Sequence, residues 1–83
     1  MQIDPLTERV LRYLADRYLP VASDWVETRD AAQDLDLHVA DVNARCQTLV
    51  ARGLIELSPP DEEHAGYAAL ITNKGLLAIG RAP

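Results

Sequence analysis

The sequence of 83 residues predicts a small α+β fold that is mainly helical. Apolar residues recur at helical spacing in three stretches, at about residues 4–19, 29–35 and 39–52. Two shorter stretches have the aliphatic and aromatic content of strands, and the nine residues between them are rich in Pro and acid. These strands are expected at residues 54–57 and 67–71. The length suits one small domain, so we expect residues 1–83 to fold as a single unit.

The third helical stretch, residues 39–52, has the clearest pattern. Val42, Cys46, Leu49 and Val50 lie on one helical face, which we expect to be buried. Gly53 follows, and glycine is the residue best able to end a helix in a left-handed conformation. The chain then changes directly from a helical to a strand pattern.

The first helix is expected to begin at Asp4-Pro5, with Asp as the N-cap and Pro at the first helical position. It should end near Tyr18, because Pro20 is not compatible with its continuation. We expect a short strand at Trp25-Val26, and Thr28 as the cap of the second helix. The residues around 76–79 predict a final short helix.

Composition excludes several classes of protein. No apolar run approaches the ~20 residues needed to span a bilayer, and the first ten residues lack the pattern of a signal peptide. We therefore expect a cytoplasmic protein without membrane contact. Cys46 is the single cysteine, so neither a disulfide within the chain nor a cysteine metal cluster is expected. No phosphate-binding loop or nucleophile motif is present, and we expect neither an enzyme nor a bound cofactor.

Charge is distributed unevenly along the chain, whose net charge is −5. Residues 24–38 and 56–66 are acidic. Between them, residues 39–55 hold Asp41 against Arg45 and Arg52. The third helix is therefore expected to be slightly basic between two acidic segments.

The order of elements resembles that of winged helix-turn-helix domains of the MarR-like and the archaeal or phage repressor-like kinds. Ala31-Ala32, Leu35 and Leu37 carry the resemblance in the second helix and turn, and Val42 to Ile55 carry it in the third helix and its exit. Tyr67 with Leu70, Thr72, Lys74 and Gly75 is similar to the end of such wings. The resemblance implies three helices, a β-hairpin wing and a short C-terminal helix.

The same resemblance implies a transcriptional regulator that binds duplex DNA with the third helix in the major groove. Carried over by position, Asn43 and Gln47 would contact adenine edges, and Arg45 or Arg52 would contact phosphate. The N-terminus of the second helix would bind a further phosphate. The implied DNA-binding residues are Thr28, Arg29, His38, Asn43, Arg45, Gln47, Thr48 and Arg52.

An alternative is a winged-helix module that binds a protein partner and not DNA. Asp61, Glu62 and Glu63 stand where wings that bind DNA carry basic residues, and carboxylates there would repel phosphates. Asn43, Gln47 and Thr48 are equally compatible with an ordinary solvated helix surface. A continuous positive patch joining Arg29, Arg45 and Arg52 would favour DNA, whereas an acidic or apolar face would favour protein.

The chain leaves little room for a long dimerisation helix outside these elements. We expect a monomer or a modest homodimer formed by the first helix and the C-terminal segment, with Leu76, Leu77 and Ile79 in the contact.

Overall fold

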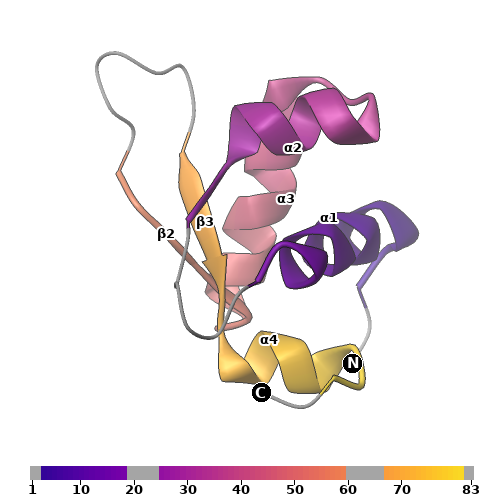
Figure 1. Cartoon of the computed structure of the whole chain (residues 1–83), viewed down its shortest axis with the longest axis vertical. Coiled ribbons are helices and arrows are strands. Elements are labelled where there is room, and N and C mark those ends of the chain that lie inside the picture. The colour runs from indigo at the N-terminus through magenta and orange to yellow at the C-terminus, as the bar shows by residue number, and fades with distance from the viewer. Residues whose placement is uncertain (1–2, 19–24, 60–66, 82–83) are drawn as a thin grey trace.

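The computed structural model describes residues 3–18, 25–59 and 67–81 of the chain. Within these ranges it contains four helices and a three-stranded sheet (Figure 1). In chain order the elements are α1 (Pro5–Asp16), β1 (Val26–Glu27), α2 (Thr28–Leu35), α3 (Val39–Ala51), β2 (Ile55–Leu57), β3 (Ala68–Ile71) and α4 (Asn73–Ala78). Asp61, Glu62 and Glu63, the acidic residues of the predicted wing, lie outside the described residues.

The sheet has the strand order β1-β3-β2, and both of its pairings are antiparallel. The predicted pairing of the two later strands is confirmed, with Ile55 opposite Ile71 and Leu57 opposite Ala69. Strand β1 begins one residue later than predicted and pairs Val26 with Ala69. This order of helices and strands is consistent with a winged-helix layout. Other small α+β proteins can share the same order, so the order alone does not identify that layout.

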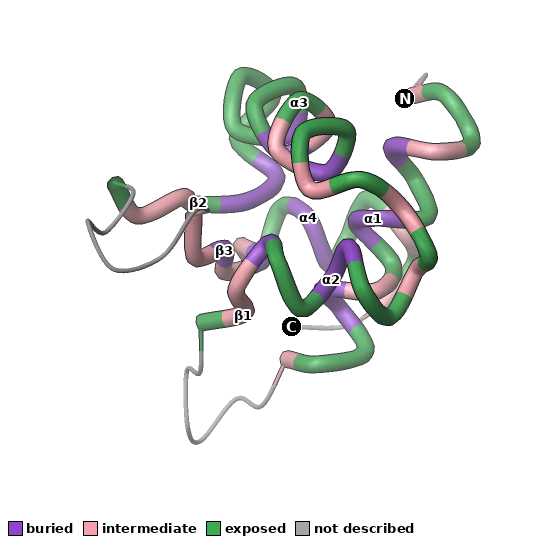
Figure 2. Tube along the Cα trace, turned by 90° about the horizontal axis from the view of Figure 1, so that it is seen from above, coloured by how far each residue is buried: buried purple, intermediate pink, exposed green. Residues whose placement is uncertain are grey.

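The hydrophobic core lies between α1, α3 and the sheet. Val10 and Leu11 of α1 and Val42, Cys46 and Leu49 of α3 have no exposed surface. The core is completed by further residues of α1, two alanines of α2, residues in or next to the strands, and α4, namely Leu14, Ala15, Ala31, Ala32, Leu54, Ile55, Ala69, Ile71 and Leu76. Figure 2 shows the buried segments of the four helices turned toward a common centre. The predicted inward face of the third helix is therefore confirmed, except at Val50, which is 37% exposed.

The end of α3 follows the predicted glycine exit. Gly53 has a φ of +73°, and its N–H donates to the Val50 carbonyl over 2.9 Å. The Leu54 N–H then donates to the Leu49 carbonyl over 3.0 Å. These two bonds satisfy carbonyls that the helix end would otherwise leave unpaired. The turn sends the chain directly into β2.

The predicted boundaries of the other helices need correction. Helix α1 is shorter than predicted and ends at Asp16, with Arg17 as its C-cap. Thr28 does not cap α2, because Glu27 holds the N-cap position. Instead the Thr28 N–H donates to the Tyr67 carbonyl over 2.8 Å, and the Thr28 hydroxyl accepts from the Tyr67 N–H over 3.1 Å. Thr28 thus extends the contact between β1 and β3.

Helix α4 is attached to the exit of α3 by Thr72. The Thr72 hydroxyl donates to the Gly53 carbonyl over 2.8 Å and accepts from the Gly75 N–H over 3.1 Å.

None of the described helices is both long enough and apolar enough to cross a membrane.

Candidate interaction surface on helix α3

Helix α3 lies at the edge of the molecule, and its exposed segments face away from the core (Figure 2). With 3.6 residues per turn, the residues opposite Val42, Cys46 and Leu49 form one continuous strip. We call this strip the outward face of α3. It consists of Ala40, Asp41, Ala44, Gln47, Thr48 and Ala51, all of which are exposed.

The outward face is small, weakly polar and almost uncharged. Three of its members are alanines, and Asp41 is the single charged one. Gln47 and Thr48 are exposed as predicted, although the Thr48 hydroxyl donates to the Ala44 carbonyl over 3.3 Å. The middle of the face therefore offers one amide and one partly occupied hydroxyl, and it contains no cation.

Arg45 does not belong to this face. It lies beside the inward residue Cys46, on the side of α3 that faces the start of α1. Its guanidinium Nη1 is 3.5 Å from the Asp4 carboxylate, and its Nε is shielded from solvent. The Thr7 hydroxyl beside Asp4 is the largest cause that lowers the pKa of the Asp4 carboxyl below its ordinary value; desolvation opposes it, and Arg45 lowers the pKa further. Arg45 thus connects α3 to α1, and a phosphate would have to displace this contact.

The two residues at the start of α2 that were predicted to bind phosphate also make contacts within the fold. The Thr28 hydroxyl is buried and bonded to Tyr67. The Arg29 guanidinium is 4.0 Å from the Glu27 carboxylate, and both side chains are exposed. The predicted phosphate site at this helix therefore has one buried hydroxyl and one cation that already faces an acid.

Two further residues that were predicted to contact DNA are not placed as expected. Asn43 is half-buried, and its side-chain oxygen is shielded from solvent. The side chain would have to rotate outward before it could contact an adenine edge. His38 is exposed and is the N-cap of α3, although its side chain makes no capping hydrogen bond.

Arg52 is the predicted cation that remains available. It is exposed at the C-cap of α3 and makes no ion pair with any residue that the structure describes. Lys74 approaches the same corner, with its ammonium nitrogen 3.7 Å from the position that a side chain on Gly53 would take. Because Arg29 and Arg45 face carboxylates elsewhere, the three predicted arginines do not form a continuous positive patch.

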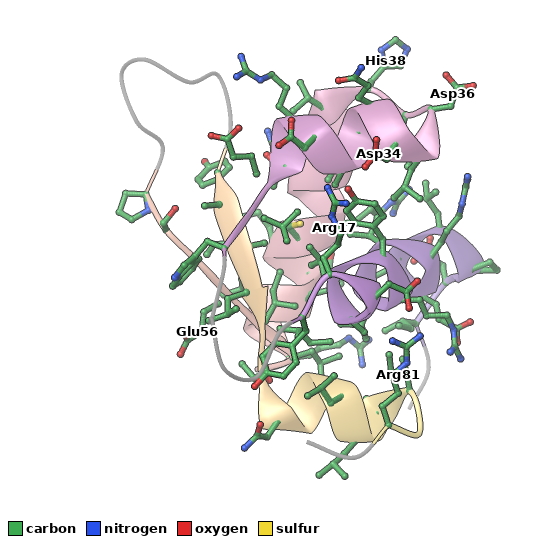
Figure 3. The ribbon with its side chains drawn as sticks, in the orientation of Figure 1. Arg17, Asp34, Asp36, His38, Glu56 and Arg81 are labelled. Atoms are coloured by element: carbon green, nitrogen blue, oxygen red, sulfur yellow. The ribbon has the colours of Figure 1, made fainter. Side chains whose placement is uncertain are left out.

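Acidic side chains surround the turn between α2 and α3. Asp36 and His38 project outward from this turn (Figure 3), and Asp30 and Asp34 are exposed along α2. Asp34 is engaged with α1, because its carboxylate accepts from the Tyr13 hydroxyl over 2.5 Å and is 3.6 Å from the Arg17 guanidinium. Burial, followed by this hydrogen bond, raises the pKa of Tyr13 to about 12.

The surface contains no sign of metal or covalent chemistry within the described residues. No group of three His, Cys, Asp or Glu side chains there lies close enough together to hold a metal ion. Cys46 is buried, and burial raises the pKa of its thiol to about 12, which keeps the thiol protonated at neutral pH.

The comparisons with known proteins return no match. No family model matches the chain, and no curated protein or solved structure shows significant similarity to it.

The sequence already contained the signal that separates Arg45 from the outward face. Arg45 is three residues after Val42 and one before Cys46, so a helical wheel places it next to the buried side. The pairing with Asp4 depends on how α1 crosses α3, and no local pattern indicates that crossing.

Proposed function

We propose that this protein is a winged-helix module that binds a protein partner, with the outward face of α3 as the contact surface. The single observation that carries this proposal is the charge of that face, which consists of one carboxylate and no cation. Proteins that bind nucleic acid gain most of their affinity from Lys and Arg that neutralise phosphates. A helix with Asp41 near its start and three alanines on its exposed strip is poorly suited to that task.

The surroundings of α3 support the same proposal. Arg29 and Arg45 face Glu27 and Asp4, so their charge is partly neutralised before any ligand arrives. The exposed acids of α2 and of the following turn add negative charge beside the start of α3. The net charge of −5 would slow the approach of a duplex and weaken its binding. Protein interfaces, by contrast, tolerate an uncharged centre with charges at the rim.

Duplex DNA is the alternative that the order of elements supports, because Gln47 and Thr48 occupy exposed positions on α3. The experiment that separates the two functions is a titration of the protein against a labelled mixed-sequence duplex, followed by fluorescence anisotropy at low and at physiological salt. We expect no saturable binding at either salt concentration. Phosphate contacts strengthen steeply as salt falls, so the low-salt arm is the more sensitive one.

Matched variants identify the surface if any binding is seen. Arg52→Ala removes the available cation at the end of α3, and Arg12→Ala removes a cation of α1 that lies on another surface. Salt-dependent binding that Arg52→Ala and Gln47→Ala weaken, and that Arg12→Ala leaves unchanged, would overturn the proposal in favour of a DNA-binding regulator.

A further inference from the structure

We propose that the partner of the outward face is a second copy of the same face, packed antiparallel about a twofold axis near residues 46–47. The inference rests on the function proposed above and specifies its partner. In such an isologous contact, residue i of one copy meets residue j of the other, and residue j meets residue i. A surface can pair with itself in this way only if its two ends are complementary.

The charges at the two ends of α3 meet this requirement. Asp41 is exposed in the first turn, and Arg52 is exposed at the C-cap. Neither makes an ion pair with the described residues, in contrast to Arg12, Arg17 and Arg81, which are all paired. At 100° per residue, Arg52 lies in line with Asp41, just beyond the C-terminal end of the outward face and about 16 Å away along the axis.

Antiparallel packing brings equal edges of two helices together, so Asp41 of each copy would face Arg52 of the other. The same contact would therefore form twice. Parallel packing would instead bring opposite edges together, so Asp41 and Arg52 would each face the uncharged edge that holds Gln47 and would gain no partner of opposite charge. The charges thus select both the partner and its direction.

The small residues of the face permit close approach of two helices. Ala44 and Ala51 have no side-chain atoms beyond Cβ, and small residues allow helix axes to approach to the short end of the usual range of about 8–10 Å. Gln47 lies on the edge opposite Asp41 and Arg52, at the height of the twofold axis. The two Gln47 amides would meet there, and an amide can both donate to and accept from its own copy.

The contact is small. A helix of 13 residues is about 20 Å long, and one pair of such helices buries less than the ~1,600 Å² of a standard interface. We therefore expect a weak, reversible dimer whose population rises with concentration. Association should weaken as salt is added, because the Asp41–Arg52 pairs would lie at the exposed rim.

Sedimentation equilibrium of the full chain over micromolar to millimolar concentrations tests the proposal. Asp41→Arg and Arg52→Asp should each weaken association by on the order of tenfold, because each converts two attractive pairs into two repulsive ones. A mixture of the two variants should associate again, since each end of α3 in one variant then faces a side chain of opposite charge in the other. The double variant Asp41→Arg, Arg52→Asp should recover the wild-type association.

Controls separate this contact from other surfaces and from loss of folding. Ala44→Arg should abolish association, whereas Glu56→Arg and Arg12→Glu reverse exposed charges away from the outward face and should have little effect. Circular dichroism of each variant checks folding. A wild-type chain that stays monomeric at millimolar concentration would overturn the inference, as would a mixture that associates no better than either variant alone. Binding of DNA through Gln47 would instead overturn the proposed function, so the two failures are distinguishable.

Discussion

The inward and outward faces of helix α3 differ in how strongly folding restricts which side chains they can carry. On the inward face, Val42, Cys46 and Leu49 are completely buried, and their size and shape are set by the packing of α1 and the sheet. On the outward face, Ala44, Gln47 and their neighbours contact little else in the chain, so folding alone accepts many side chains there. The composition of the outward face therefore carries more information about function than that of the inward face. Its lack of cations is the part of this information that argues against DNA.

The largest difference between the faces should appear in cysteine reactivity. Cys46 is buried with its thiol pKa raised to about 12, so a thiol reagent should react only when the structure opens. A cysteine introduced as Thr48→Cys on the outward face should react at least about a thousand times faster at neutral pH, because an exposed thiol has a pKa near 8.5. Labelling of each chain, measured by mass spectrometry, checks this. Equal rates would mean that α3 presents the opposite face to solvent.

Truncation of one residue on each face gives the next largest effect. Leu49→Ala should lower the free energy of unfolding by about 2–5 kcal/mol, because it leaves a cavity in the core. Gln47→Ala should change it by no more than about 0.5 kcal/mol, because its side chain is exposed. Urea unfolding measures both values. Similar losses from the two variants would contradict the assignment of faces.

The two threonines of the predicted site form a further matched pair. Thr28→Val should lower the free energy of unfolding by about 1–3 kcal/mol, because the buried hydroxyl bonded to the Tyr67 N–H is lost. Thr48→Val should cost about 0.5 kcal/mol or less, because its hydroxyl is exposed and bonds only within α3. Urea unfolding of both variants measures the two changes in the free energy of unfolding. A Thr28→Val chain as stable as wild type would remove the structural role assigned to Thr28.

The smallest effect concerns the contact between α1 and α2, where charges are paired, unlike those of the outward face. The Tyr13 phenol bonded to Asp34 has a pKa of about 12, above the value of about 10 expected in the unfolded chain. Its contribution to stability is therefore complete below pH ~10 and is lost as the pH rises toward 12. The difference between the ultraviolet titrations of wild type and Tyr13→Phe should show a midpoint near 12. A midpoint near 10 would contradict the contact.

The sequence predicted the elements better than it predicted the contacts between them. Helical spacing and Gly53 were sufficient for α3 and its exit, because both depend on local backbone preferences. The antiparallel pairing of the two later strands was also predicted, whereas their register was not. Val50 was misplaced because it lies at the margin of the apolar face, where exposure depends on neighbouring elements. Leu76 was expected at a dimer contact but is buried in the core, which leaves Leu77 as the exposed member of the predicted set.

The candidate site was less predictable because its charges are paired over long distances in the chain. Arg45 contacts Asp4, and Arg81 contacts Asp16 over 2.6 Å. Arg17 contacts Asp34 (Figure 3). Arg9 of α1 also donates to the Leu35 carbonyl at the end of α2 over 3.1 Å. Pairs of this kind form only after the helices cross, so counting charges along the sequence overestimates the cations available to a ligand.

The most direct test of the outward face as a protein contact is crosslinking between copies of the chain. With Gln47→Cys, a short bismaleimide should link two chains, because the antiparallel packing places the two positions across the twofold axis. With Glu56→Cys, an exposed position on β2, the yield should stay at the background level of the unmodified chain. Adding Arg52→Asp to Gln47→Cys should lower the yield of the link clearly, because it weakens association. Equal yields from Gln47→Cys and Glu56→Cys, or a yield that Arg52→Asp leaves unchanged, would contradict the account.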